Sequence, residues 1–432
     1  MRLSPTARTT RTALGAIAAG ALMLGGASTA SAGVGTQPSR PATTASAASL
    51  AAYAFTPGDI RMRSALTTRA TAARFGTAFS GAVVDAASNA TVWRLNGTTG
   101  RMPASTNKLV TASNALTLFG PNKQWTTRVL TGAALNQVVV QGSGDPSLTS
   151  ANLDAMAATA AAWLVARKVT SARVLVDDDV FPTPTLAYGW KASYVPDSIT
   201  AVRGLVRDQS SNADTAADAG RYFRDRLKAR GMPVAYYAGR VNAASTATVI
   251  ASTKGATLSS MVTRMLLNSY NEIAEALHKQ VGLGLRYGAT WSGARTAQAK
   301  ELAVQKLTSG TLYDGSGLSR ADRLTALQLA AIVDRGIDAG TQATLWPLKS
   351  GLPTAGRTGT LASRFTTATS KCAQGRVFAK TGTLGDVVSL AGWTTGADGR
   401  AKAFAFLVNA KTSSTTLKQN VDMLAATVTG CY

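Results

Sequence analysis

Histidine and cysteine are scarce in this chain of 432 residues, which has one histidine and two cysteines. A metal site of several histidines is therefore excluded, and two cysteines are too few for a cysteine-rich zinc site. The histidine, His278, ends a predicted helix, where a surface or capping role is expected. The acidic run Asp177, Asp178 and Asp179 ends a predicted strand and is interpreted as a solvated turn. Since no glycine-rich segment has the spacing of a dinucleotide-binding motif, the sequence predicts no cofactor.

Long hydrophobic runs are also missing. No segment offers about 18 uninterrupted apolar residues, so the sequence predicts no transmembrane helix. Residues 1–32 combine three arginines, a short apolar run and the closing residues Ala30-Ser31-Ala32, a pattern typical of a secretory signal peptide. Residues 33–50 are small and polar and are expected to form a flexible leader. The mature protein is thus predicted to be secreted and soluble, in the periplasm or the cell wall.

Acidic residues are few, because 22 aspartates and glutamates stand against 45 lysines and arginines, a formal charge of +23. Loss of the signal peptide, with its three arginines and no acidic residue, leaves +20. A surface this basic favours an anionic partner. The basic residues are scattered and no nucleic-acid-binding motif accompanies them, so nucleic acid is not expected. The anionic cell wall is the partner that the charge favours, and the alternative is that the charge only confers solubility.

The two cysteines are Cys372 and Cys431, and an oxidising compartment favours a disulfide between them. Two free thiols and a bridge between two copies of the chain are the alternatives, because spacing alone does not establish connectivity. The sequence does not reveal the oligomeric state.

The two ends of the chain have clear secondary-structure patterns. Residues 79–97 are typical of a β-hairpin. Residues 377–384, 387–395 and 401–410 predict three strands, and their short connections make them antiparallel. Residues 415–430 predict a terminal helix with a glycine stop.

The middle of the chain differs, with helices expected near residues 153–168 and 216–230 and a strand between them. We interpret residues 123–250 as an inserted α/β module. It would divide a catalytic domain into residues 51–122 and 251–432.

The chemistry is first indicated by Ser105 and Lys108, which stand three residues apart in the first turn of a helix predicted to run to Gly120. At this spacing both side chains lie on one face, so the amine can reach the hydroxyl. Lysine acts as a base only when neutral, a form that desolvation favours. The helix start adds N–H groups and a positive dipole that suit an oxyanion.

Two further motifs follow in order. Ser269, Tyr270 and Asn271 lie between two predicted helices, and Lys380-Thr381-Gly382-Thr383 lies on a predicted strand. The order S-x-x-K, S-x-N, K-T-G is that of penicillin-binding proteins and active-site serine β-lactamases. The three motifs together are a far stronger indication than the serine–lysine pair alone.

With GSGDPSL at residues 142–148, DGSGLSR at 314–320 and LPTAGRTGTL at 352–361, the chain resembles the class C low-molecular-mass penicillin-binding proteins. These are D-alanyl-D-alanine carboxypeptidases and endopeptidases. The resemblance covers nearly all of the mature chain and departs from the family at Tyr270, where aspartate is frequent. It implies an α/β (α+β) fold, with an antiparallel sheet flanked by helices as in serine β-lactamases, and substrates among peptidoglycan stem peptides and β-lactams.

The resemblance also implies catalytic roles. Ser105 would attack the carbonyl between the two D-alanines while Lys108 takes its proton. The backbone N–H groups of Ser105 and Thr383 would form the oxyanion hole. Ser269 would relay a proton to the leaving amine, and Asn271 would hold Lys108 and the substrate amide.

Substrate recognition is implied by the same resemblance. Lys380, Thr381 and Thr383 would hold the terminal carboxylate, and Gly382 would permit close approach of the substrate.

The amino-acid side chain of the stem peptide would meet Arg320 and an aspartate of the inserted module. Asp197 is the candidate for that aspartate, and it could equally be a surface turn residue. Leu384 would contact the same side chain.

Two alternatives remain at this point. A serine β-lactamase would share the acylating serine, but the long insertion and DGSGLSR argue against it. A non-catalytic wall-binding scaffold would not need the reactive pair.

Overall fold

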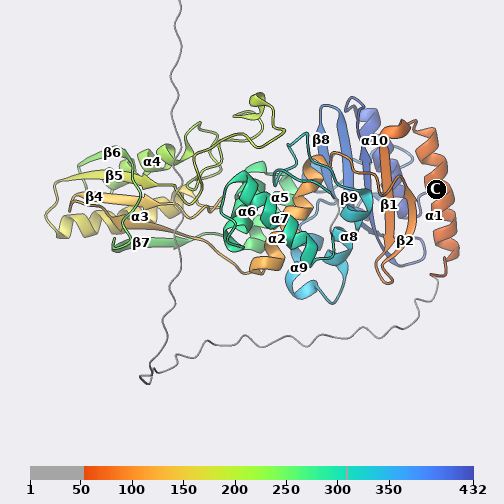
Figure 1. Ribbon diagram of the computed structural model, residues 1–432, viewed down its shortest axis with the longest axis horizontal. Helices are drawn as coiled ribbons and strands as arrows, with labels where there is room; N and C mark the ends of the chain where they lie inside the picture. Colours follow the sequence, from red (N-terminus) through yellow and green to blue (C-terminus); the bar gives the residue numbers. More distant parts are fainter. Residues whose placement is uncertain (1–52, 308–309) are drawn as a thin grey trace, which may run out of the picture. The chain divides into compact units, whose positions relative to one another are not determined.

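The computed structural model describes residues 53–307 and 310–432, so the predicted signal peptide and leader lie outside the described residues. The strands form two five-stranded sheets, with the orders β2-β1-β10-β9-β8 and β6-β5-β4-β3-β7 (Figure 1). The strands are β1 (Phe79–Asp85), β2 (Ala90–Leu95), β3 (Thr126–Thr131), β4 (Gln137–Gln141), β5 (Ser171–Asp177), β6 (Val234–Arg240), β7 (Val249–Lys254), β8 (Phe378–Leu384), β9 (Val387–Thr395) and β10 (Ala401–Val408). The α-helices are α1 (Pro57–Ala72), α2 (Lys108–Phe119), α3 (Ser150–Ala166), α4 (Thr215–Ala229), α5 (Leu258–Asn268), α6 (Asn271–Gly284), α7 (Trp291–Val304), α8 (Ala326–Ile337), α9 (Gln342–Ser350) and α10 (Thr415–Val428). Within the described ranges no helix has both the length and the apolar character that a membrane span requires.

The predicted hairpin and the three predicted strands are confirmed in the first sheet, and the predicted terminal helix is confirmed as α10. All its strand pairs are antiparallel, and β1 pairs with β10 although more than 300 residues separate them. Along β10 the side chains alternate between the two faces. Phe404 and Phe406 enter one core with α1 and α10, whereas Ala403 and Ala405 enter another core with the helices on the opposite face (Figure 1).

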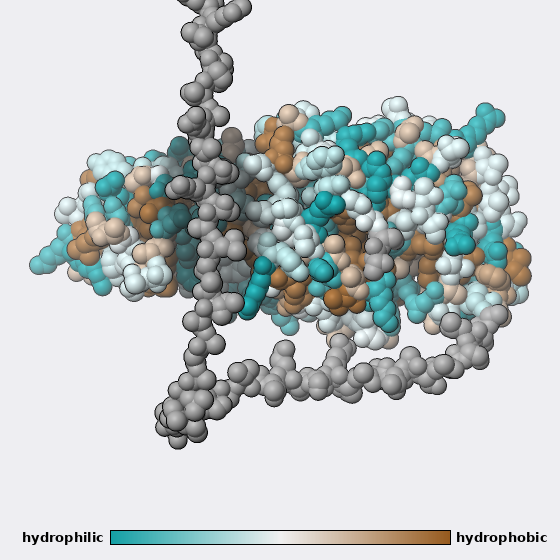
Figure 2. Space-filling view, in the orientation of Figure 1, coloured by the Kyte–Doolittle hydropathy of each residue, from teal (hydrophilic) through white to brown (hydrophobic). Residues whose placement is uncertain are grey.

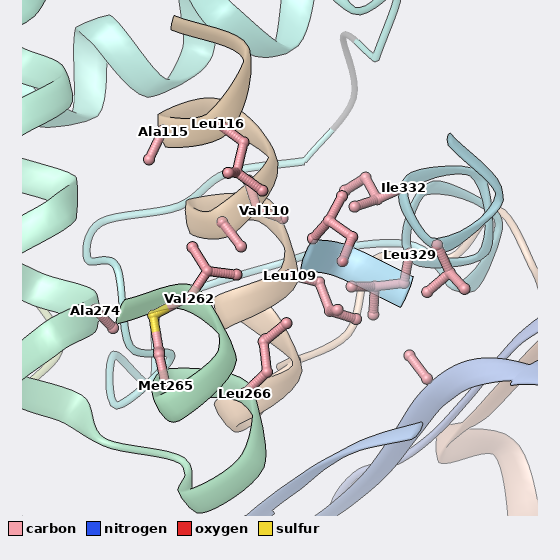
Figure 3. Packing of buried hydrophobic residues seen from close by; sticks show 14 of the residues in the cluster. Leu109, Val110, Ala115, Leu116, Val262, Met265, Leu266, Ala274, Leu329 and Ile332 are labelled. Atoms are coloured by element: carbon pink, nitrogen blue, oxygen red, sulfur yellow. The ribbon is translucent and has the colours of Figure 1, made fainter. Parts of the chain in front are cut away.

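Helix α2 lies at the centre of that second core. Its residues Leu109, Val110 and Leu116 are fully buried, as the apolar side of the predicted helix requires. Figure 3 shows this helix between α5 and α8. The labelled partners on those two helices are Val262, Met265, Leu266, Leu329 and Ile332. Because apolar side chains surround α2 on several sides, the residues at its start are held rigidly.

The second sheet is mixed and has its own core with α3 and α4. β3 pairs antiparallel with β4 and β7, whereas β5 pairs parallel with β4 and β6. Each parallel connection contains a helix, which is the usual crossover of an α/β unit. The two helices and the strand between them that the sequence predicts in the middle of the chain are confirmed as α3, β5 and α4.

Two long-range links join segments that are far apart in the sequence. Lys402 on β10 is buried, and its Nζ lies 2.8 to 2.9 Å from three carboxylates. These belong to Asp59 on α1, Asp85 on β1 and Asp398. A disulfide joins Cys372 to Cys431, beyond the end of α10.

Candidate active site

Ser105 and Lys108 lie where the chain enters α2, in a tighter geometry than the predicted helical turn. The four residues from Ala104 form a turn of 3-10 helix, and α2 begins only at Lys108. Ala104 has a φ of +47°, in the left-handed region that residues with a Cβ rarely adopt. Ser389 on β9 holds this turn, since its Oγ donates to the Pro103 carbonyl at 2.6 Å. The surrounding structure therefore maintains a strained backbone next to Ser105, as is frequent at functional sites.

Lys108 is fully buried and its Nζ has three oxygen neighbours. They are Ser105 Oγ at 3.1 Å, Asn271 Oδ1 at 2.7 Å and the Ser316 carbonyl at 2.8 Å. Asn271 Oδ1 and the carbonyl can only accept hydrogen bonds, whereas a hydroxyl can also donate. A neutral amine has two N–H groups and one lone pair, so its lone pair points at the one partner able to donate, Ser105. This is the geometry of a base beside a nucleophile.

The electrostatics favour that neutral form. Burial lowers the pKa of Lys108 to about 8, against the opposing influence of the acidic side chains of Glu275, Asp314 and Glu272. Burial costs the ammonium its hydration, and the surrounding carboxylates offset only part of that cost. At neutral to mildly alkaline pH a useful fraction of Lys108 is therefore free to accept a proton.

The S-x-N motif forms the junction between α5 and α6. Ser269 directly follows α5 and has a φ of +64°, and Asn271 is the first residue of α6. Asn271 donates from Nδ2 to the Ser198 carbonyl at 2.7 Å while its Oδ1 faces Lys108. The amide is therefore oriented by a contact on each side. Ser269 and Asn271 both line a cavity with Ser105.

The K-T-G motif lies on β8, the edge strand beside the nucleophile turn. Lys380 is fully buried with Nζ donating to the Thr381 carbonyl at 2.9 Å, and burial lowers its pKa well below the ordinary value. Thr381 donates to Thr360 at 2.9 Å. A Cβ on Gly382 would lie 2.1 Å from Ser389 Oγ and 3.1 Å from Ser105 N. Only glycine therefore lets β8 approach the nucleophile this closely.

The cavity beside Ser105 has a volume of about 680 Å³. Its walls come from the three motifs, the DGSGLSR loop, the end of β8 and a segment between β5 and α4. The lining residues are Ser105, Lys191, Tyr194, Ser198, Ser269, Asn271, Leu318, Arg320, Thr383, Leu384, Gly385 and Asp386. Thr383, Leu384 and Arg320 thus line the same cavity as the predicted nucleophile, whereas Lys380, Thr381 and Gly382 are not among its lining residues.

Arg320 pairs with a carboxylate that the sequence analysis did not consider. Arg320 forms two parallel hydrogen bonds of 2.8 Å with Asp386, which lies just after β8. This pairing raises the pKa of Arg320 and lowers that of Asp386. Asp197 is exposed and does not line the cavity. Sequence reasoning missed Asp386, although it stands only two residues after Leu384.

Two buried carboxylates behind the cavity were also missed. Asp314 accepts hydrogen bonds from Gly317 N and Ser319 N of its own loop. Glu275 on α6 accepts from Gly315 N and Ser316 N, and burial raises its pKa to about 8. Together they shape the DGSGLSR loop so that its Ser316 carbonyl meets Lys108. The sequence could have indicated Glu275, because it stands one helical turn after Asn271 and so lies on the same side of α6.

The surface role expected for His278 is wrong. It is 1% exposed on α6, and burial lowers its pKa to about 4, so it is a neutral core residue. The solvated turn expected at Asp177–Asp179 is wrong in part, because Asp177 and Asp178 are buried. Asp178 forms ion pairs with Arg203 and Arg240.

The chain matches the family model described as the D-Ala-D-Ala carboxypeptidase 3 (S13) family over residues 62–203 and 198–428. It is 31% identical to carboxypeptidase DacB of Mycolicibacterium smegmatis, over 82% of this chain and 80% of that protein. It is 32% identical to a carboxypeptidase of Mycobacterium tuberculosis, over 76% of each. The crystal structure of penicillin binding protein 4 from Haemophilus influenzae has the same fold, with a TM-score of 0.71, 20% identity, and coverage of 85% of this chain and 99% of that one. The chain therefore belongs to the D-Ala-D-Ala carboxypeptidase 3 (S13) family of serine peptidases.

Proposed function

We propose that this protein is a serine D-alanyl-D-alanine carboxypeptidase that acts on peptidoglycan stem peptides through an acyl-enzyme on Ser105. The observation that carries the proposal is the buried Lys108, whose Nζ lies 3.1 Å from Ser105 Oγ and whose other two contacts only accept hydrogen bonds. Membership of the S13 family supports the substrate class.

Acylation begins when Ser105 Oγ attacks the carbonyl carbon between the two D-alanines and Lys108 takes its proton. Negative charge then develops on the carbonyl oxygen. The N–H groups of Ser105 and Thr383 stabilise it, because the absence of a side chain at Gly382 lets the two backbones come together. The peptide C–N bond breaks, and the departing amine takes a proton through Ser269.

Water then hydrolyses the ester on Ser105, with Lys108 again as the base, and releases the shortened stem peptide. Asn271 keeps Lys108 oriented and offers its amide to the substrate. The terminal carboxylate of the substrate binds against Lys380, Thr381 and Thr383 on β8. Its negative charge favours the ammonium form of Lys380 and so opposes the burial that lowers the pKa of this lysine. Thr381 also fixes the strand through Thr360. Arg320 and Leu384 contact the side chain of the stem peptide.

β-Lactams acylate the same serine in this proposal. A penicillin binding protein 4 of the same fold has been crystallised with a β-lactam. An enzyme of this substrate class works outside the cytoplasm, so residues 1–32 act as a signal peptide and the cell wall is the place of action. Hydrophilic side chains are spread over the face seen in Figure 2. The excess of lysine and arginine over acidic residues favours attraction of the protein to an anionic wall.

The test compares the parent protein with Ser105→Ala on diacetyl-L-lysyl-D-alanyl-D-alanine and on benzylpenicillin. We expect release of D-alanine and a long-lived penicillin adduct on Ser105 by mass spectrometry, with both absent in the variant. Crosslinked muropeptides as a second substrate measure endopeptidase activity. Undiminished D-alanine release by Ser105→Ala would contradict the proposal. Rapid hydrolysis of benzylpenicillin without an adduct would identify a β-lactamase. A parent protein that shows no acylation and no turnover would instead be a non-catalytic scaffold.

A further inference from the structure

A segment between β5 and α4 reaches over the catalytic residues. This segment, residues 187–199, is called the arm below. Apart from one turn of 3-10 helix at Ala192–Tyr194 it has no regular secondary structure. Yet hydrogen bonds join its two ends to two separate parts of the active site, the DGSGLSR loop and the S-x-N motif.

At one end the arm is joined to the DGSGLSR loop. Trp190 donates from its ring Nε1 to Asp314 Oδ2 at 2.7 Å. Arg320 N donates to the Gly189 carbonyl at 3.1 Å, and Ser319 Oγ donates to the Tyr188 carbonyl at 2.8 Å. The Trp190 ring also packs edge-to-face on Trp291, with 5.3 Å between centroids. The approach is so close that a Cβ on Gly189 would lie 2.6 Å from Ser319 Oγ.

At its other end the arm contacts the S-x-N motif. The Ser198 carbonyl accepts the hydrogen bond from Asn271 Nδ2 at 2.7 Å. An amide that gives its N–H to Ser198 must turn its oxygen the other way, and that oxygen meets Lys108. The arm therefore determines which end of the Asn271 amide faces the lysine.

Both acceptors that hold Lys108 in place thus depend on the arm. The orientation of Asn271 depends on the arm directly, through Ser198. The position of the Ser316 carbonyl depends on the arm through Asp314, which accepts three hydrogen bonds of 2.7 to 2.8 Å. Two of these come from Gly317 N and Ser319 N within the loop, and the third comes from Trp190. The Asp314 side chain is fully buried, so water does not replace a missing donor there.

We propose that Trp190 is a positioning residue for the serine–lysine pair: its ring N–H holds Asp314, and with it the loop whose Ser316 carbonyl aims Lys108 at Ser105. The inference rests on the proposed function and goes beyond it, because it makes the chain between β5 and α4 part of the acylation machinery. Trp190 does not touch the reacting atoms. Its loss should therefore reduce the rate of acylation more than it weakens binding of the substrate.

The test is Trp190→Phe, which keeps an aromatic ring beside Trp291 but removes the N–H donor together with part of the indole ring. Trp163→Phe on α3 is the matched control, since it makes the same chemical change in the same part of the chain, away from the loop. We expect Trp190→Phe to lower kcat and the rate of acylation by benzylpenicillin about tenfold, the usual effect of one hydrogen bond to a charged group. KM should change less than twofold, and the control should match the parent protein.

A double-mutant cycle with Asp314→Asn distinguishes positioning from a general loss of structure, with melting temperatures recorded for each variant. If the ring acts through Asp314, adding Trp190→Phe to Asp314→Asn should lower kcat less than twofold further. Independent, multiplying effects would overturn the inference, as would a kcat for Trp190→Phe equal to that of the control. A parent protein that neither turns over peptide nor is acylated would refute the proposed function itself, whereas a reactive parent with an unaffected Trp190→Phe refutes this inference alone.

Discussion

With Lys108 as the proposed base, the acylation of Ser105 should depend on pH, because this lysine is buried among carboxylates. Burial lowers the pKa of Lys108 to about 8, so the neutral amine becomes more abundant as the pH rises through that value. By the titration relation, about one Lys108 in eleven is neutral at pH 7 and about ten in eleven at pH 9, a rise of about tenfold in the reactive form. Acylation should therefore accelerate from pH 6.5 to 9 and then level off.

Charged groups near Lys108 influence the position of this rise. Glu275 also has a pKa of about 8, raised mainly by burial, so it titrates in the same range. The apparent pKa of the rate profile then belongs to the coupled groups and not to Lys108 alone. As the pH rises, Glu275 loses its proton and its negative charge favours the Lys108 ammonium, so the coupling broadens the rise without changing its direction.

The assay is the second-order rate constant of acylation by benzylpenicillin, measured by mass spectrometry in buffers of constant ionic strength. Melting temperatures at each pH exclude unfolding as the cause. Lys108→Arg is the matched variant, because arginine stays charged throughout this range. It should be at least about 100-fold slower and independent of pH. A parent rate that is flat or falls between pH 6.5 and 9 would refute Lys108 as the base.

Three further predictions concern packing and long-range links. Gly382→Ala should remove acylation and lower the free energy of unfolding by about 1–3 kcal/mol, because the new methyl overlaps Ser389 Oγ. The control Gly385→Ala has open space around it and should keep the parent's melting temperature. Equal stability of the two variants would contradict the packing argument. Lys402→Met should cost about 3–5 kcal/mol in a urea titration, since it leaves three carboxylates without their buried partner; a loss below about 1 kcal/mol would show that the cluster is hydrated. Cys431→Ser opens a loop of 59 residues and should cost about 4 kcal/mol under oxidising conditions; a parent melting temperature that does not respond to reductant would argue against the bond.

Much of the fold could be predicted from local patterns. The strands β8, β9 and β10 follow from apolar runs broken by short turns, and α10 follows from its period and its glycine stop. Each of these signals lies within about a dozen residues. The same is true of the motifs around Ser105, Ser269 and Lys380, whose residue types and order identify the chemistry before any contact is known.

The contacts that tune this chemistry could not be read in the same way. His278 was expected at the surface, but it lies on the buried side of α6. The face that a helix buries depends on every element packed around it. The pairing of Arg320 with Asp386 joins side chains 66 residues apart.

The sequence by itself determined the three motifs to which we assign the reaction and the strands and helices that present them, because spacing, periodicity and turn residues act over short distances. Only the tertiary structure decided how those residues work. It buried Lys108 so that its amine is available as a base, and it brought Trp190 to Asp314 across 124 residues of chain. Burial and long-range hydrogen bonds arise when separate segments pack together, and no short pattern records which segments those will be.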